Sequence, residues 1–559
     1  MLEQLVECVP NISEGRDLEK INAIASVVET VEGIKLLDID PGSSTNRTVI
    51  TFVGKPEQVI EAAFLLVKKA SELIDMSKHS GEHPRMGATD VCPLVPVSNI
   101  TLEELVPYAH RLGERIGREL GIPGYFYESA AKTESRRNLA VCRKGEYEGL
   151  AKLSEKESAP DFGPAEFNAK VKKTGATAVG VRDFLVAYNV NLNSTSTRRA
   201  NAIAFDIREA GRLRPGKASD DPQGEPERIP GTLKSVKGIG WYIEEYGIAQ
   251  LSLNLTNINI TPVHVAFDEA CRASAERGIR VTGSEVVGLV PLRVLTEAAD
   301  HYLVKQERSL GISVREKIKI AVKSLGLDDL APFNPEEKII EFMIGSEGGA
   351  KRLIDMTLTA FADETSAESP APGGGSISAY CGALGVALGT MVANLSAHKR
   401  GWDDRWEEFS DWAVKGLGYQ NQLIMLVDED TNAFNKIIDA FRMPKASAEE
   451  AAARKNAIQD ATKYAVEVPL KVATLCCQSM EVMAAMVKIG NPNSITDAGV
   501  GAMCARTGVL GAVMNIKINV GDLEDKTFVA KVLAQAKELE AKAQLMEDEI
   551  RAYVNGKIE

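Results

Sequence analysis

The sequence predicts a multidomain protein, with an N-terminal α/β (α+β) part made of two subdomains and a C-terminal all-α helical domain. Its 559 residues suffice for three or four compact units at roughly 100 to 200 residues per domain. Eighteen of the 23 prolines precede residue 346, whereas ten of the 14 methionines follow it. Proline breaks helix interiors and methionine fills irregular helix-packed cores. The segment 346–559 is therefore predicted to be helical, with a linker at 331–345.

The first subdomain, residues 1–182, alternates strand-like and helical runs. Strands are predicted at 34–39, 48–53, 90–97 and 125–127, and helices at 56–76 and 102–120. In the helix at 56–76, apolar residues recur at helical spacing from Val59 to Val67. This alternation is typical of an α/β or α+β unit.

The second subdomain, residues 183–330, opens on another strand-like run. Strands are predicted at 184–193, 251–260 and 281–289, and a helix at 263–276. The intervening segment 208–231 carries four prolines and many charges, which favours a solvated excursion. It can be a plain surface loop or a lid over a substrate site.

The helical domain contains a stretch, residues 369–397, without a charged side chain. Its length suits a membrane span, but its six glycines, its serines and Asn394 favour a helix buried in a folded domain. No membrane association is expected. The first residues have acids where a signal peptide has bases, so no export is expected either.

Charge and cysteine usage limit the partners and the compartment. The formal net charge of −13 disfavours nucleic acid. The eight cysteines are scattered without the spacing of metal ligands, which indicates reduced thiols in a cytoplasmic protein.

A short segment, residues 79–87, holds two of the six histidines beside an arginine. The spacing of His79 and His83 suits zinc on a helix, but Gly81 and Pro84 oppose a continuous helix there. The alternative is a turn whose histidines satisfy backbone groups. A second candidate segment is the turn at 38–49, at the end of a predicted strand. It displays three polar side chains, Asp40, Asn46 and Arg47.

An apolar helical stripe in the C-terminal domain is interrupted by one carboxylate, Asp430. Its apolar members are Leu423, Leu426, Val427, Phe434, Ile437, Ile438 and Phe441. A carboxylate facing a core is costly unless it is partnered or has a raised pKa suited to proton transfer. A structural ion pair is the alternative. Upstream, the glycines before Ser376 can admit a ligand to a helix start or can form a flexible linker.

Four long motifs carry a resemblance to a known family. The segments LVECVPNISEG, STNRTVITFVG, IDMSKHSGEHPRMGATDVCP and GIGWYIEE are similar to the formiminotransferase part of the formimidoyltransferase-cyclodeaminase family. The segment SPAPGGGS and the small-residue helix after it resemble the cyclodeaminase domain of the same family. The resemblance therefore covers nearly the whole chain, apart from the excursion at 208–231.

The resemblance implies a bifunctional folate enzyme of histidine degradation. The formimino group of N-formimino-L-glutamate would move to N5 of tetrahydrofolate, and cyclisation would then release ammonia and leave 5,10-methenyltetrahydrofolate. His83 would be the acid/base of the transfer, with Asp40 as its partner carboxylate, and Arg47, Arg85 and Asn46 would bind substrate.

The resemblance also places folate binding and the second reaction. The family's folate segment corresponds to Gly163, Pro164, Ala165, Glu166, Phe167, Asn168, Ala169, Lys170, Val171 and Lys172. The lysines at its end suit a polyglutamate tail, or form a solvated basic run. Asp430 corresponds to the catalytic aspartate of the deamination. Tetrahydrofolate is the expected cosubstrate, no metal is expected, and the family suggests a homo-oligomer that acts on small molecules.

Two rival functions stay open at this point. The C-terminal domain could be a methenyltetrahydrofolate cyclohydrolase, whose helical family shares the PAPGGGS-like start. The chain could instead be a folate-binding or scaffolding protein without catalysis, although His83, Arg85 and Asp430 are all present. Release of ammonia from 5-formiminotetrahydrofolate distinguishes the first rival, and folate binding without turnover indicates the second.

Overall fold

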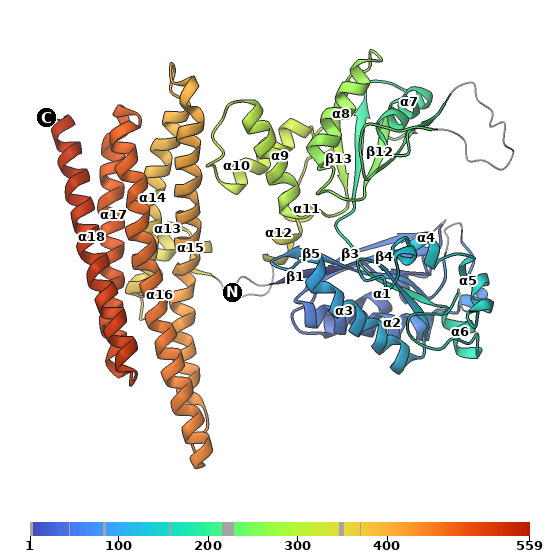
Figure 1. Cartoon of the computed structure of the whole chain (residues 1–559), viewed down its shortest axis with the longest axis horizontal. Helices are drawn as coiled ribbons and strands as arrows, with labels where there is room; N and C mark the ends of the chain where they lie inside the picture. Colours follow the sequence, from blue (N-terminus) through green and yellow to red (C-terminus); the bar gives the residue numbers. More distant parts are fainter. Residues whose placement is uncertain are drawn as a thin grey trace. The chain divides into compact units, whose positions relative to one another are not determined.

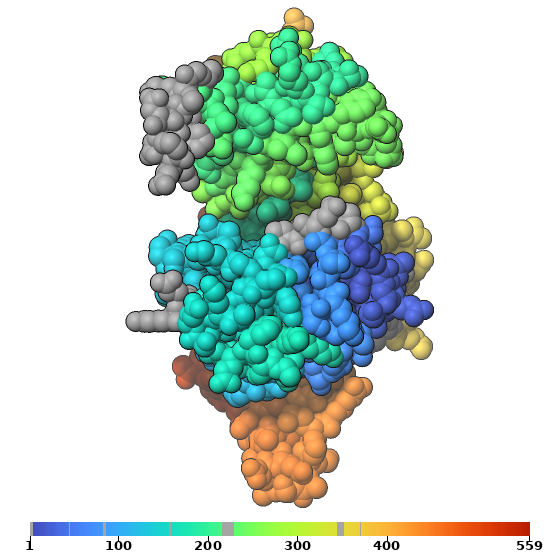
Figure 2. Space-filling view, turned by 90° about the vertical axis from the view of Figure 1, so that its right-hand side faces the viewer, coloured from blue at the N-terminus to red at the C-terminus, as the bar shows by residue number. Residues whose placement is uncertain are grey.

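The computed structural model describes residues 4–43, 45–81, 85–155, 158–214, 228–345, 352–368 and 371–558 (Figure 1). The chain divides into two compact units. The sheet unit comprises Met1–Val294 and Leu325–Glu347, and the helical unit comprises Leu295–Ser324 and Gly348–Glu559. Figure 2 shows the surface of the sheet unit, with the segments of its first sheet in blue to teal and those of its second sheet in green.

The first sheet of the sheet unit is mixed. Its strands are β1 (Leu5–Cys8), β2 (Asn11–Ile12), β3 (Lys35–Gly42), β4 (Arg47–Gly54), β5 (Thr89–Ser98), β6 (Gly124–Glu128) and β7 (Thr177–Val181). The short strands β1 and β2 share one position, because each pairs antiparallel with both β4 and β5. Beyond β5 the sheet continues with parallel β7 and β6, while β3 pairs with β4 at the other side.

Helices and short turns cover this sheet. The α-helices are α1 (Leu18–Ala25), α2 (Pro56–Leu73), α3 (Leu102–Arg115), α4 (Leu139–Cys142), α5 (Glu146–Gly149) and α6 (Ala169–Thr174). The shorter turns are η1 (Ser26–Thr30), η2 (Met76–Lys78), η3 (Ile116–Leu120), η4 (Glu134–Arg137) and η5 (Leu150–Lys152). A capping box fixes the start of α3, because the Thr101 side chain accepts from the Glu104 N–H and the Glu104 side chain accepts in return. The apolar sides of α1, α2 and α3 pack with the sheet into one core that contains Ile21, Leu66 and Phe52.

The second sheet is antiparallel in the order β11-β12-β8-β13. Its strands are β8 (Val186–Leu192), β11 (Val236–Ile243), β12 (Ile248–Leu255) and β13 (Val281–Val287). Helices α7 (Thr197–Ile207) and α8 (Val263–Ala275) accompany it, and α11 (Pro335–Lys338) and α12 (Ile340–Gly345) follow later in the chain. A separate two-stranded pair, β9 (Arg212–Leu213) with β10 (Arg228–Ile229), stands at the base of the predicted excursion, whose residues 215–227 lie outside the described part.

The helical unit is built from long helices. They are α9 (Leu292–Lys305), α10 (Val314–Leu325), α13 (Leu358–Ser366), α14 (Gly374–Ala397), α15 (Trp406–Arg442), α16 (Ala448–Ile489), α17 (Ile495–Asn519) and α18 (Lys526–Ile558). The short turns η6 (Leu353–Asp355), η7 (Asp403–Arg405), η8 (Pro492–Ser494) and η9 (Val520–Asp522) connect them. The five helices from α14 onward share one apolar core that contains Val386, Phe409, Met483 and Val509.

Among the described residues, three helical stretches are long and apolar enough to cross a membrane. They are Gly374–Ala397, Ala448–Ile489 and Pro492–Asp522, and 61%, 61% and 50% of their most apolar windows are buried within the protein. Their burial agrees with the packed helix predicted for residues 369–397. That the protein has no membrane association stays a prediction.

The predicted fold class is confirmed: a multidomain chain with two sheet-containing subdomains and a mostly helical C-terminal part. One predicted strand is too long, since 251–260 was expected throughout and β12 ends at Leu255. The next residues form a turn in which Asn257 O accepts from the N–H groups of Ile260 and Thr261. The boundaries predicted near 182, 330 and 345 stay predictions.

Candidate active sites

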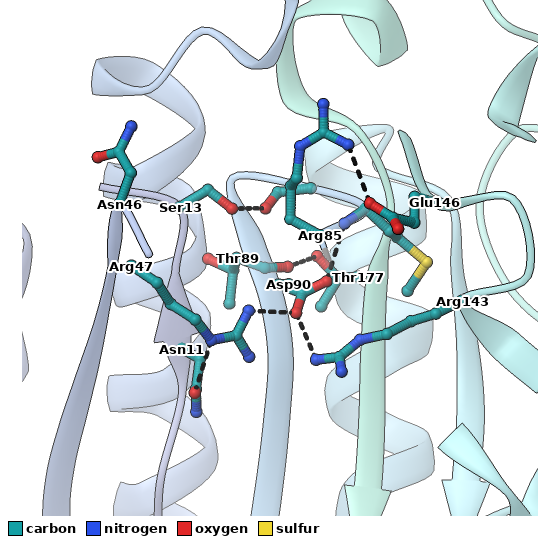
Figure 3. Close-up of polar contacts among 12 residues, drawn as sticks. Asn11, Ser13, Asn46, Arg47, Arg85, Thr89, Asp90, Arg143, Glu146 and Thr177 are labelled. Atoms are coloured by element: carbon teal, nitrogen blue, oxygen red, sulfur yellow. Dashed lines mark hydrogen bonds and ion pairs between the residues drawn. The ribbon is translucent and has the colours of Figure 1, made fainter. Parts of the chain in front are cut away.

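A buried carboxylate on β5, Asp90, joins two arginines from distant parts of the sequence (Figure 3). Asp90 is 0% exposed. Its Oδ2 accepts hydrogen bonds from the guanidinium groups of Arg47 and Arg143, and its Oδ1 accepts one from the Met86 N–H at 2.9 Å. Burial lowers the pKa of Arg47, and Asp90 opposes that shift. Two guanidinium groups thus face one carboxylate, so the formal charge of these three side chains is +1.

The segment 79–87, here named the histidine loop, is tied to the turn that precedes β4. The Asn46 side chain donates to Ser80 O at 2.9 Å, and His79 Nε2 lies 2.9 Å from Asn46 O. A β-carbon at Gly81 would lie 2.2 Å from Thr45 O, so the close approach of loop and turn requires glycine there. Asn46 therefore positions the histidine loop, and its predicted contact with substrate stays a prediction.

The predicted acid/base pair is only partly within the described residues. His83 lies outside them, with its two neighbours, so its role stays a prediction. Asp40 lies on β3, is exposed, and makes no side-chain hydrogen bond or ion pair to a described residue. His79 Nδ1 is buried and has no hydrogen-bond partner in that same part of the chain. The pairing of Asp40 with His83 stays a prediction.

Arg85, predicted to hold a substrate carboxylate, is engaged by the protein's own carboxylates. Its Nη1 and Nη2 donate to Glu148 at 2.8 and 2.7 Å, and its Nη1 lies 3.2 Å from Glu146 Oε2. Its guanidinium also lies 5.8 Å from the centre of the Tyr147 ring. The hydrogen bonds from Arg85 stabilise the carboxylate form of Glu148 and lower its pKa. Arg85 would have to release these partners to bind substrate through both of its NH2 groups.

Beside Asp90 lies a groove with a cavity volume of about 900 Å³, lined from both sheets of the sheet unit. Its basic lining residues are Arg47, Arg137, Arg143, Arg182 and Lys237, and its acidic ones are Glu128, Glu146 and Asp183. The excess of positive charge favours an anionic ligand, although the whole chain is acidic. Arg47 and Arg143 line this groove while they hold Asp90 beneath it.

The predicted folate segment, Gly163 to Lys172, is mostly exposed. Gly163 has a φ of 79°, and a β-carbon there would lie 2.4 Å from Ile122 O, so this turn needs glycine. Asn168 caps α6 by accepting from the N–H groups of Lys170 and Val171, each at 3.0 Å. The ring of Phe167 lies 6.1 Å from that of Tyr147, edge to face. The segment does not line the groove, and its folate contact stays a prediction.

The second site lies where α15 meets the first turn of α14. Asp430 Oδ2 accepts from the Ser376 N–H at 3.0 Å and from the Ser376 Oγ at 3.3 Å. Ser376 Oγ also lies 2.8 Å from Val427 O, so its single O–H is shared between that carbonyl and Asp430. A β-carbon at Gly375 would lie 2.0 Å from Asp430 Oδ1, so the carboxylate rests directly on the glycine backbone. The glycines before Ser376 therefore admit a side chain of the protein itself.

The environment of Asp430 favours its protonated form. Burial raises the pKa of the carboxyl above its ordinary value, and the two hydrogen bonds from Ser376 oppose the shift. Asp430 forms no ion pair with any lysine, arginine or histidine in the part of the chain that the structure describes. The structural ion pair considered from the sequence is therefore absent there, and a buried carboxyl with a raised pKa remains.

The apolar stripe around Asp430 is unevenly buried. Leu423, Leu426 and Val427 belong to the core and Ile437 packs against it partly buried, whereas Phe434 and Phe441 are 42% and 55% exposed. The stripe therefore places only some of its apolar side chains in the shared core of the unit.

The two carboxylates beside Asp430 contact other segments. Asp428 Oδ1 accepts from the Leu353 N–H at 2.7 Å, and Glu429 accepts from the hydroxyl of Tyr464. Both therefore hold neighbouring segments in place.

Comparisons with known proteins cover both sites. Family descriptions match residues 5–182 (formiminotransferase domain, N-terminal subdomain), 187–345 (formiminotransferase domain) and 357–538 (formiminotransferase-cyclodeaminase). The formimidoyltransferase-cyclodeaminase of Mus musculus is 44% identical over 531 residues, which are 95% of each chain. The chain belongs to the formimidoyltransferase-cyclodeaminase family. The resemblance stated from the sequence is thus confirmed.

Other relatives of this family member match one half each. A glutamate formimidoyltransferase of Streptococcus pyogenes serotype M1 is 42% identical over 303 residues, which are 54% of this chain and 94% of the relative. A methenyltetrahydrofolate cyclohydrolase of Methylorubrum extorquens is 32% identical over 202 residues, 36% of this chain and 97% of the relative. The solved formiminotetrahydrofolate cyclodeaminase of Thermotoga maritima covers 36% of this chain and 98% of its own, with 26% identity and a TM-score of 0.33.

The glycine and proline of the histidine loop disfavour metal ligation by His79 and His83. Over the described residues, no group of three or more His, Cys, Asp or Glu side chains is arranged to hold a metal ion. His83, one of the two histidines considered as zinc ligands, lies outside those residues. The expected absence of metal stays a prediction.

Two polar residues of the first site were missed from the sequence, Asp90 and Arg143. Arg143 follows the four-residue helix α4, and nothing in its local sequence relates it to residues fifty positions earlier. Asp90 did carry a signal, because it is one carboxylate at the start of the apolar run 91–97. Like Asp430, Asp90 is a lone carboxylate beside apolar residues, a pattern that indicates a partnered or functional group.

Proposed function

We propose that this family member transfers the formimino group of N-formimino-L-glutamate to N5 of tetrahydrofolate and then closes 5-formiminotetrahydrofolate to 5,10-methenyltetrahydrofolate with release of ammonia. The observation that carries the proposal is the match of bifunctional relatives over 95% of the chain. A cyclohydrolase activity of the helical unit is not favoured, because the cyclohydrolase relative matches 36% of the chain whereas the bifunctional relatives match both units.

In the transfer, N5 of tetrahydrofolate attacks the formimino carbon and forms a tetrahedral intermediate. The C–N bond to glutamate then breaks, and the departing nitrogen takes up a proton. A histidine suits this exchange because its ordinary pKa is about 6.5. We assign the exchange to His83, with Asp40 as its partner, and the basic groove supports the binding of a substrate that carries two carboxylates.

In the deamination, N10 of the folate attacks the same carbon, now carried on N5. The imine nitrogen gains protons, its bond to carbon breaks, and ammonia leaves as the methenyl bridge forms. Asp430 supports this step because burial raises the pKa of its carboxyl, which makes it a better holder of a proton than an exposed aspartate. The Ser376 N–H and hydroxyl hold that carboxyl in place.

Several finer properties belong to the proposal. We assign a polyglutamylated tetrahydrofolate as the cosubstrate, no metal, a homo-oligomer and a cytoplasmic location, with no membrane or nucleic-acid partner. Exposed Lys170 and Lys172 support a polyglutamate tail, and the absence of disulfides among the eight cysteines supports a reducing compartment.

One assay tests the function directly. Enzyme is incubated with N-formimino-L-glutamate and tetrahydrofolate, while ammonia and the methenyl absorbance are followed together. The proposal predicts that both rise in equal amounts. Formation of 5-formiminotetrahydrofolate without ammonia would leave a transferase alone, and folate binding without either product would favour a scaffold.

A further inference from the structure

We propose that Asp90 is a positioning residue of the transfer reaction, which holds Arg47 and Arg143 together as a receptor for a carboxylate of the formimino donor and fixes this receptor relative to the histidine loop. This inference rests on the proposed function. Asp90 itself touches no substrate in this scheme, because it is fully buried beneath the groove.

The receptor is assembled from three separate segments. Arg47 begins β4, Asp90 lies in β5, and Arg143 follows α4, and in Figure 3 the Asp90 carboxylate stands between the two guanidiniums. Arg47 donates one hydrogen bond to Asp90 and one to Asn11. Arg143 donates one hydrogen bond to Asp90, and its buried Nε has no hydrogen-bond partner in the described part of the chain. Each guanidinium thus keeps donors for a further acceptor.

Charge explains why a carboxylate is needed between these arginines. Two guanidiniums that are 9% and 16% exposed repel one another in a site that water screens poorly. Asp90 cancels one of the two charges, so the pair can form and still present one net positive charge to the groove. A planar carboxylate is the ligand that paired guanidinium N–H groups bind best. The formimino donor supplies such a group.

The second oxygen of Asp90 links this receptor to the histidine loop. Asp90 Oδ1 accepts from the Met86 N–H, at the end of the loop opposite to the contacts that Asn46 makes with His79 and Ser80. One carboxylate therefore sets the distance between the donor's binding groups and the loop that carries His83. Loss of either contact would leave the substrate bound out of register with the acid/base.

The test uses the full-length chain with Asp90→Asn, in steady-state transfer assays that vary each substrate separately. We expect kcat/KM for N-formimino-L-glutamate to fall about 100-fold, the loss that misplacement by about 1 Å can cause. KM for this donor should rise much more than KM for tetrahydrofolate. Deamination of supplied 5-formiminotetrahydrofolate, measured on the same preparation, should stay at the wild-type rate.

A matched control is Asp206→Asn. Asp206, on α7, is also shared by two arginines, Arg277 and Arg212, but does not line the groove. This variant should transfer at the wild-type rate. If Asp90→Asn loses no more transfer than Asp206→Asn, or leaves KM for N-formimino-L-glutamate unchanged, Asp90 does not hold a carboxylate receptor and the inference is overturned.

If Asp90→Asn does not fold, Arg143→Gln tests the carboxylate receptor instead, because it leaves the pair of Arg47 and Asp90 intact. It should raise KM for the donor about 10- to 100-fold, the worth of one charge-assisted hydrogen bond, and Arg143→Lys should recover part of that loss. An unchanged KM in Arg143→Gln would overturn the inference. Absence of transfer in the wild-type protein would instead refute the proposed function.

Discussion

Gly375 is the position at which a single methyl group tests the second site most sharply. Alanine is favoured over glycine within helices by up to about 1 kcal/mol, so Gly375→Ala in α14 should otherwise be harmless. Its β-carbon, however, would lie 2.0 Å from Asp430 Oδ1 and 2.4 Å from Asp430 Cγ. Ordinary carbon contacts are about 3.5 to 4.0 Å, so the carboxyl must move by more than 1 Å. Displacement of that size typically costs about 100-fold in rate.

The assay is ammonia release from supplied 5-formiminotetrahydrofolate, with formimino transfer measured in parallel. Gly375→Ala should lower the rate of ammonia release about 100-fold and leave the rate of formimino transfer unchanged. Gly374→Ala is the matched control, because its β-carbon would meet its nearest neighbour, Asn515 Nδ2, at an ordinary 3.4 Å. Equal deaminase rates in the two variants would refute the argument that the carboxyl must rest on this glycine.

Three further substitutions test the remaining assignments. His83→Asn should reduce transfer about 100- to 10,000-fold while deamination of supplied substrate persists; near-normal transfer would make His83 structural and His79 the next candidate. Asp430→Asn keeps the Ser376 N–H bond, so the free energy of unfolding should change by about 1 kcal/mol or less, while deamination falls and 5-formiminotetrahydrofolate accumulates; a destabilised but active variant would contradict the catalytic assignment. Burial raises the pKa of Glu7 from 4.5 to about 7, with Arg182 opposing, so the folded state binds more protons than the unfolded state between those values. The free energy of unfolding should therefore fall as pH rises across that range. Glu7→Gln should flatten that dependence in denaturant titrations, and identical pH profiles would contradict it.

Strong periodicity allowed most elements to be predicted from the sequence. The helix expected at 56–76 is α2, and the strand expected at 90–97 is β5, because each buries one continuous apolar set in the shared core. Strand β11 was missed, since Gly238 and Gly240 weaken the strand pattern there. A β-carbon at Gly240 would lie 2.2 Å from the Asn201 backbone nitrogen, so packing against α7 requires glycine there. The same glycine weakens the strand pattern in the sequence.

The site residues also differ in whether the sequence alone could indicate them. Asp430 could be selected from one helix because its spacing within an apolar stripe is local. The fate of Phe434 and Phe441 was not predictable, because their exposure depends on how far the other helices extend along α15. The link between Asp90 and Arg143 joins residues 53 positions apart, and only the folded chain brings them together.

The central claim is that one chain carries two separate sites that act in sequence, and mixing two inactive variants tests it most directly. His83→Asn and Asp430→Asn are each incubated with N-formimino-L-glutamate and tetrahydrofolate, alone and together, while ammonia is measured. Each variant alone should release almost no ammonia, and Asp430→Asn should accumulate 5-formiminotetrahydrofolate. The mixture should recover ammonia release after a lag. Failure of the mixture to release ammonia, with both variants folded, would contradict the account.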